Sequence, residues 1–155
     1  MAEIEFRLTA MDEGDAAVLV QAMREEISAV YDGMDLDSPQ MPKAGTAELG
    51  PPHGAFLVGY RDGAAICCGG VKRLDDRHCE LKRMYVAPEA RGGGVGRRLL
   101  RALENTAREL GYAVARLDTG PRQPSARHLY ESDGYVPVAN FNGNPVASFF
   151  GEKSL

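Results

Sequence analysis

The chain has 155 residues, of which 44% are hydrophobic and 26% are charged. This composition is too apolar for a disordered protein and the length suits one domain, so we predict a single domain over residues 1–155. The formal net charge of −4 argues against a general nucleic-acid binder, because such proteins usually present a basic surface. The same charge is compatible with a cationic substrate, but it is also ordinary for a globular protein.

The cysteines predict buried thiols rather than a disulfide framework, because Cys67, Cys68 and Cys79 are odd in number and lack paired spacing. No cysteine and histidine cluster has the spacing of metal ligands, so we expect no metal. The first residues lack the apolar core of a signal peptide, and no apolar stretch approaches the roughly 18 residues of a membrane span. We therefore expect a cytoplasmic protein without a membrane or nucleic-acid partner.

The period of the apolar pattern predicts the elements in chain order. Residues 4–8 alternate between apolar and charged side chains, which predicts a half-buried strand. Apolar residues then recur at helical spacing from Ala16 to Val30. Residues 32–54 are rich in proline and glycine, which predicts a long loop with at most a short helix near residues 43–49.

From residue 55 onward, short turns separate runs that are typical of strands, and two helical segments interrupt them. The predicted strands are 55–60, 64–74, 79–86, 113–119, 135–138 and 148–154, and the predicted helices are 95–110 and 125–132. Short turns predict an antiparallel meander, whereas the helical crossover makes the strands on either side of it parallel. The predicted fold class is α/β, of the α+β type. We expect a central mixed, mostly antiparallel, twisted sheet of about seven strands flanked by about four helices.

The most distinctive segment is a glycine-rich loop between a strand and a helix, Arg91-Gly92-Gly93-Gly94-Val95-Gly96-Arg97. The first N–H groups of a helix have no intrahelical partner, and with the helix dipole they form a site for phosphate. Glycine lets the backbone approach an anion closely and adopt a positive φ. The alternative is a glycine-rich connection that holds no ligand.

Two other phosphate loops fit this segment less well. A dinucleotide loop that begins at Gly92 needs a third glycine where Arg97 stands. A P-loop needs Gly-Lys followed by serine or threonine, which does not occur in the chain. The remaining pattern is R-x-x-G-x-G, formed by Arg91, Gly94 and Gly96.

Two segments resemble motifs of the GNAT superfamily of acetyl-CoA-dependent N-acetyltransferases. The pyrophosphate-binding motif is matched by Leu81-Lys82-Arg83-Met84-Tyr85-Val86-Ala87-Pro88-Glu89-Ala90-Arg91-Gly92-Gly93-Gly94-Val95-Gly96. The motif A-x-x-L-Y-E-x-x-G-[FY] is matched by Ala126-Arg127-His128-Leu129-Tyr130-Glu131-Ser132-Asp133-Gly134-Tyr135. The resemblance covers about residues 55–138, whereas residues 1–54 match only in the order of elements. It implies a single-domain GNAT-like fold and transfer of an acetyl group from acetyl-CoA to a primary amine in a ternary complex.

The resemblance also implies which residues bind the cofactor. The backbone that should hold its pyrophosphate belongs to Arg91, Gly92, Gly93, Gly94, Val95 and Gly96. The Arg97 side chain either reaches a phosphate or is a solvated helix residue. The strand end Met84, Tyr85 and Val86 should pair with the pantetheine arm like an added strand, with the Val86 N–H as oxyanion donor. Gln123 stands where many members carry an asparagine that bonds the pantetheine, and its longer side chain keeps or shifts that contact.

Two residues are the main catalytic candidates by the same resemblance. Tyr130 occupies the position of the general acid that protonates the departing thiolate, and the alternative is a core tyrosine. Glu80 matches a position where several members carry a catalytic glutamate that acts through water, and partial burial would raise its pKa. The alternative for Glu80 is a salt-bridged surface residue. Asp118 is a third carboxylate candidate, and His78 is expected to be solvent-exposed.

The acceptor amine is not identified by the sequence. Four acidic residues could form an acidic rim around the acceptor pocket: Asp32, Asp35, Asp37 and Glu48. Four others could form an apolar wall of that pocket: Tyr31, Met34, Met41 and His53. An ordinary solvated loop is the alternative for both groups. A non-catalytic sensor that binds acyl-CoA and a nucleotide-binding protein are the competing functions. Dimers are common in the family, so a homodimer remains an option that no residue indicates.

Overall fold

The computed structural model describes residues 3–155, and among them seven strands form one sheet. The sheet order is β1-β2-β3-β4-β5-β7-β6. The strands are β1 (Glu5–Leu8), β2 (Ala55–Arg61), β3 (Ala64–Arg73), β4 (His78–Val86), β5 (Val114–Thr119), β6 (Val136–Pro137) and β7 (Phe149–Ser154). All neighbouring pairs are antiparallel except β4 and β5, which are parallel across the helical crossover. The predicted mixed sheet is therefore confirmed.

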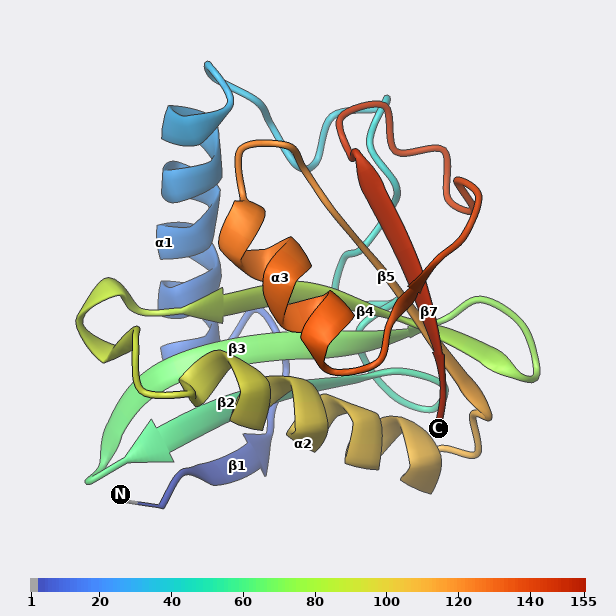
Figure 1. The fold of residues 1–155 in the computed structure, drawn as a ribbon. Coiled ribbons are helices and arrows are strands. Elements are labelled where there is room, and N and C mark those ends of the chain that lie inside the picture. The colour runs from blue at the N-terminus through green and yellow to red at the C-terminus, as the bar shows by residue number, and fades with distance from the viewer. Residues whose placement is uncertain (1–2) are drawn as a thin grey trace.

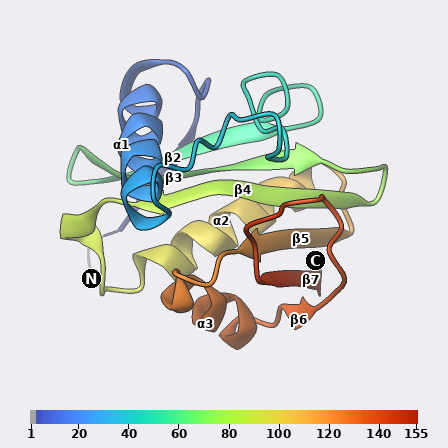
Figure 2. The same ribbon diagram turned by 90° about the horizontal axis from the view of Figure 1, so that it is seen from above.

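Three α-helices cover the two faces of this sheet, as Figures 1 and 2 show. Helix α1 (Gly14–Val30) lies on one face, and α2 (Val95–Glu109) and α3 (Pro124–Ser132) lie on the other. A short 3₁₀ helix, η1 (Pro88–Ala90), precedes the glycine loop. Proline at the first position of η1 stops β4, because it has no N–H to donate to a neighbouring strand.

Because both faces are covered, the central strands bury side chains on both sides. Cys67 and Cys68 are adjacent on β3 and fully buried, and they belong to different hydrophobic clusters. The Cys67 cluster contains Leu99 and Leu103 of α2, whereas the Cys68 cluster contains Val20 of α1. Adjacent residues on a strand point to opposite faces of the sheet, so the placement of Cys67 and Cys68 in different clusters is as predicted. All three cysteines are free thiols.

The most consequential feature of the sheet is that β4 and β5 separate. Their parallel pairing covers only His78–Glu80 against Val114–Arg116, and the two strands then diverge toward their C-terminal ends (Figure 1). The later half of β4 remains paired with β3 but has no partner on its other edge. A wedge-shaped opening therefore lies inside the domain between two strands that are neighbours in the sheet.

A bulge changes the direction of side chains on β4 beside this opening. Tyr85 pairs with Cys68 and Lys82 pairs with Gly70, so two β4 residues, 83 and 84, face only Gly69 on β3. Arg83 has φ of 58°, in the left-handed region that non-glycine residues rarely adopt. A β-bulge of this kind redirects side chains, and here residues 81–85 all line one cavity.

Some boundaries and one helix differ from the sequence-based prediction. The short helix near residues 43–49 does not form; this segment consists of turns, and Ala44 and Leu49 pack against the α1 face. Residues 3–155 form three α-helices and one 3₁₀ helix, where about four helices were predicted. The strand predicted over 135–138 covers only Val136–Pro137, although Val138 N still donates to Phe150 O of β7 at 2.8 Å.

We predict that Leu103→Ala lowers the free energy of unfolding by about 2–5 kcal/mol, because it removes a fully buried side chain from the larger cluster and leaves a cavity. Val18→Ala on α1 is the matched control, since Val18 is 69% exposed. Urea unfolding of both variants measures the difference. Equal stability of the two variants would contradict the assignment of Leu103 to the core.

Candidate active site

Two adjoining cavities occupy the opening between β4 and β5. The first, called the loop cavity here, has a volume of about 600 Å³ and is lined by the glycine loop, the end of β4 and the start of α3. The second, called the inner cavity, has a volume of about 160 Å³ and is lined by β4, the end of β5, the segment after α1 and the segment before β7. Residues on the walls of both cavities include Met84, Tyr85, Gln123 and Tyr130. The cavities therefore meet where these residues lie.

The glycine loop presents free backbone donors to the loop cavity. Gly92 and Gly94 have φ of 90° and 79°, a conformation that favours glycine. The first backbone hydrogen bond at this end of α2 runs from Arg98 N to Gly94 O at 3.1 Å. Within residues 3–155, no N–H group from Gly92 to Arg97 donates to a backbone carbonyl. These donors and the helix dipole together form an anion site at the N-terminus of α2.

The arginine side chains beside the loop are engaged with protein groups. Arg91 Nε donates to Val86 O at 2.8 Å, and its Nη2 forms an ion pair with Glu26 of α1 at 2.8 Å. Arg97 Nη2 donates to Ser132 Oγ at 2.6 Å, at the end of α3. Arg91 therefore connects the loop to β4 and α1. Arg97 links α2 to α3 through this hydrogen bond. Its side chain could reach a phosphate only by breaking that contact.

The end of β4 offers backbone groups to the same cavity. Ala87 N donates to Ile66 O on β3 at 2.8 Å. Because backbone groups alternate along a strand, the N–H and C=O of Val86 face the opposite, unpaired edge. The contact from Arg91 Nε to Val86 O lies on that edge. The sequence-based candidates Met84, Tyr85 and Val86 thus lie together on the cavity wall.

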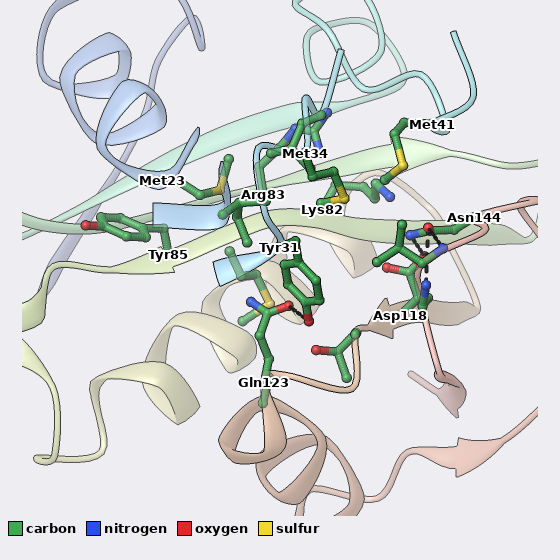
Figure 3. A pocket seen from close by; sticks show the side chains of 18 of the residues that line it. Met23, Tyr31, Met34, Met41, Lys82, Arg83, Tyr85, Asp118, Gln123 and Asn144 are labelled. Carbon is green, nitrogen blue, oxygen red and sulfur yellow. Dashed lines mark hydrogen bonds between the residues drawn. The ribbon is translucent and has the colours of Figure 1, made fainter. Parts of the chain in front are cut away.

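Gln123 lies where the two cavities meet, immediately before α3 (Figure 3). Its Oε1 accepts a hydrogen bond from the Tyr31 hydroxyl at 3.2 Å, which leaves the two Nε2 donors without a partner within residues 3–155. Gly120 makes this arrangement possible, because a Cβ there would overlap the Tyr31 hydroxyl. No sequence pattern indicates the Tyr31 contact, because it joins residues 92 positions apart.

Tyr130 is buried at the junction of the cavities. Its hydroxyl makes only a weak contact with Met84 Sδ at 3.7 Å. Burial raises the pKa of Tyr130 above its ordinary value, and the Asp118 carboxylate adds to that rise. The hydroxyl therefore stays protonated at neutral pH and has no strong acceptor among the described residues. That combination suits a proton donor better than a hydroxyl satisfied in the core.

Glu80 is fully buried where β4 and β5 separate, and it lines neither cavity. Its Oε2 lies 3.2 Å from Lys82 Nζ and accepts a hydrogen bond from Asn142 Nδ2 at 2.7 Å, while Oε1 has no partner. Burial raises the pKa of Glu80, and Asp118 raises it further, whereas Lys82 and Asn142 oppose the rise. The surface salt bridge considered from the sequence is thus replaced by a buried pair.

Asp118 is the carboxylate that the end of β5 brings to the inner cavity. Its Oδ2 accepts a hydrogen bond from Asn144 Nδ2 at 3.1 Å (Figure 3). The same oxygen accepts a hydrogen bond from Asn142 Nδ2 at 2.7 Å. Asn142 therefore links the carboxylates of Glu80 and Asp118. Sequence reasoning identified the segment before β7 only as a loop rich in asparagine and glycine. It did not identify either asparagine as part of the site.

Comparison with known proteins agrees with this geometry. Residues 20–135 match the model of the "Acetyltransferase (GNAT) family". This chain belongs to the GNAT family. The "IAA acetyltransferase" of Azospirillum brasilense is 38% identical over 111 residues, which is 69% of this chain and 72% of that protein. The identification of the family from two sequence motifs is confirmed.

Solved structures show the same fold. An acetyltransferase of the GNAT family from Staphylococcus aureus superposes with a TM-score of 0.76 at 19% identity, over 99% of both chains. A GNAT family acetyltransferase from Elizabethkingia anophelis superposes with a TM-score of 0.68 at 15% identity, over 98% of both chains. At these identities the likeness concerns the fold.

In this acetyltransferase the long loop after α1 lines the inner cavity with apolar side chains. Tyr31, Met34 and Met41 lie on the wall, as predicted, whereas His53 does not. None of the four acidic residues of the predicted rim lines the cavity. Asp32 forms an ion pair with Arg122, Asp37 forms one with Arg24, and Glu48 accepts a hydrogen bond from Gly45 N, while Asp35 caps its own turn. His78 is paired with Asp75 at a turn.

Within residues 3–155 of this acetyltransferase, none of the helices combines the length and apolar character needed to cross a membrane. In the same part of the chain, histidine, cysteine and acidic side chains do not gather in groups of three or more that would hold a metal ion.

We predict that Lys82→Met raises the pKa of Glu80 further, because it removes the nearest cation from a buried carboxylate. A raised folded-state pKa means that the native state binds the proton more tightly than the unfolded state. The free energy of unfolding should therefore fall as pH increases from the ordinary glutamate range through the raised pKa, more strongly in the variant. Carboxyl ¹³C NMR titration measures the pKa directly.

Lys72→Met is the control for this experiment. Lys72 is the register partner of Glu80 on β3, but it is not among the charges that shift the pKa of Glu80. An unchanged Glu80 titration in Lys82→Met would contradict the pairing.

Proposed function

We propose that this acetyltransferase moves an acetyl group from acetyl-CoA to a primary amine on a small molecule, amino acid or peptide, with both substrates bound at once. Acyl transfer as such follows from the family. The observation that supports the finer proposal is the meeting of two cavities at one buried, protonated hydroxyl, that of Tyr130. One cavity ends at an anion site, and the other has a carboxylate in its wall.

The loop cavity fits acetyl-CoA by the chemistry of its donors. The free N–H groups from Gly92 to Arg97 suit a pyrophosphate, and the open space around the glycines leaves room for it. The unpaired edge of β4 and the Nε2 donors of Gln123 suit the amide groups of a pantetheine arm. The Elizabethkingia relative was crystallised with acetyl-CoA bound. When bound, acetyl-CoA supplies the acetyl group as an activated thioester.

The protein's own groups then supply orientation and protons. The Val86 N–H, on the unpaired edge of β4, donates to the carbonyl oxygen as negative charge develops there. The Tyr130 hydroxyl donates its proton to the departing sulfur. A thiol is a fair leaving group even without that proton, so the acid accelerates the reaction rather than enabling it.

The base is assigned to the linked carboxylates of Glu80 and Asp118. Asp118 meets the amine because it lines the inner cavity, whereas Glu80 lies behind it and is connected through Asn142. The raised pKa of Glu80 places a proton acceptor closer to neutral pH than an ordinary glutamate. Glu80 acts through Asp118 or a water molecule rather than by direct contact.

The test of this function is to incubate the protein with acetyl-CoA and each member of a panel of amines, amino acids and peptides. Chromatography then measures how much CoA is released. Release with one acceptor class supports the proposal and identifies the substrate type. The alternative is a sensor that binds acyl-CoA without turnover. Binding of acetyl-CoA with no release above background for the entire panel would favour that sensor.

We predict that Gly94→Glu abolishes acetyl-CoA binding, because a carboxylate would replace phosphate at the N-terminus of α2. Gly111→Glu is a matched control. Gly111 also has a positive φ and open space around it, but it follows the other end of α2 and lines neither cavity. Calorimetric titration with acetyl-CoA measures both variants. Unchanged affinity in Gly94→Glu would refute the anion site.

We predict that Tyr130→Phe and Asp118→Asn each lower kcat by roughly 10²-fold, with acetyl-CoA affinity unchanged, because each removes one proton-transfer group. Glu80→Gln should lower kcat less, since Glu80 does not line the inner cavity. Steady-state kinetics and calorimetry separate the two effects. A wild-type rate for Asp118→Asn, with a larger loss for Glu80→Gln, would transfer the base role to Glu80 alone.

A further inference from the structure

The inner cavity contains a cation that no protein group neutralises directly. Arg83 lines this cavity, its Nε is buried without a hydrogen-bond partner, and it forms no ion pair within residues 3–155. A buried guanidinium nitrogen without an acceptor is costly, because its N–H loses water and gains no hydrogen bond in exchange. An unsatisfied buried group of this kind in a folded protein calls for an explanation, and a ligand that completes the site is one.

The backbone is arranged to bring Arg83 into the cavity. In a regular strand Lys82 and Arg83 would face opposite sides of the sheet, but the bulge and the φ of 58° at Arg83 put both on one cavity wall. A positive φ at a non-glycine residue is strained and persists only where the surrounding structure imposes it. Figure 3 shows Arg83 beside Met23 and Met34 at this wall.

Within the described chain, the acidic residues around Arg83 do not supply a carboxylate that pairs with it. Burial lowers the pKa of Arg83, and Asp37 is the carboxylate that opposes this most strongly. Asp37 is already paired with Arg24 at 3.1 Å, and Arg24 Nε is also buried without a hydrogen-bond partner. Two guanidinium groups thus share one carboxylate. The acidic residues that line the cavity are engaged elsewhere: Glu26 with Arg91, and Asp118 with Asn142 and Asn144. Glu80, which lies behind the cavity, is engaged with Lys82 and Asn142.

We propose that the acceptor of this enzyme carries a carboxylate, which Arg83 binds with the support of Arg24, so that the substrate class is an amino acid with an apolar side chain. The rest of the wall is apolar, with Met23, Ile27, Met34, Leu36 and Met41 available to contact that side chain. Arg83 lies on β4 and Asp118 on β5, so the two ends of the acceptor meet opposite charges. The amine of this substrate rests on the proposed function, whereas its carboxylate is inferred from Arg83 independently of that function.

The experiment measures binding of acetylated products to the CoA-bound protein, because these products have no amine that titrates. N-acetyl-L-leucine and N-acetyl-L-phenylalanine are compared with their uncharged carboxamides by calorimetry. We expect each acid to bind at least tenfold more tightly than its amide, the order of effect that a charge-assisted hydrogen bond supplies. R83Q should remove the preference, and R83K should restore part of it.

R73Q is the matched control, since Arg73 on β3 is exposed, paired with Asp76 and outside both cavities. CoA affinity reports whether R83Q is folded, because Arg83 does not line the loop cavity. Equal binding of acid and amide, a preference that survives R83Q, or no binding of either acid would overturn the proposal.

The two proposals fail in different ways. CoA release with uncharged amines and no carboxylate preference would keep the acetyltransferase function and remove this inference. A carboxylate preference without CoA release for any amine would keep the Arg83 site and remove the acetyl transfer.

Discussion

The separation of β4 from β5 is the constraint on which the rest of the site depends. A sheet normally pairs every interior strand on both edges, and buried backbone groups without partners are rare. Here pairing between the two strands stops at Glu80 and Arg116, and the later part of β4 keeps a free edge inside the domain. The free edge gives a ligand backbone groups to bind, and the divergence provides the space. Both cavities exist because of this single interruption of the ladder.

The position where the strands separate concentrates charge that the interior must stabilise. Glu80 is fully buried there, with Lys82 on one side and Asn142 on the other. A buried pair of this kind contributes little net stability, because desolvation offsets most of the attraction. Its effect is instead to hold a carboxylate with a raised pKa directly behind Asp118. Under the proposed mechanism this arrangement serves proton transfer rather than stability.

Two backbone irregularities have a similar relation to function. The left-handed glycines at 92 and 94 expose N–H groups at the start of α2, and the left-handed Arg83 lies in the bulge where residues 81–85 of β4 all line the inner cavity. Glycine adopts this conformation without strain, whereas at Arg83 it is strained, and backbone strain is found preferentially at binding sites. Here one irregularity faces the loop cavity and the other faces the inner cavity. The bulge and the loop thus prepare different ends of the same opening.

The sequence by itself determined the element order, the parallel crossover and the glycine loop. These are local properties: apolar periodicity identifies a strand or helix, and the run from Gly92 to Gly96 has its conformational freedom whatever surrounds it. The tertiary structure decided the groups that depend on distant contacts. Asn142 reaches Glu80 across 62 positions, Tyr31 reaches Gln123 across 92, and Asp37 pairs with Arg24 while Arg83 has no ion pair within residues 3–155. No local pattern encodes these pairings, because each depends on how the loops after α1 and before β7 pack over the open sheet.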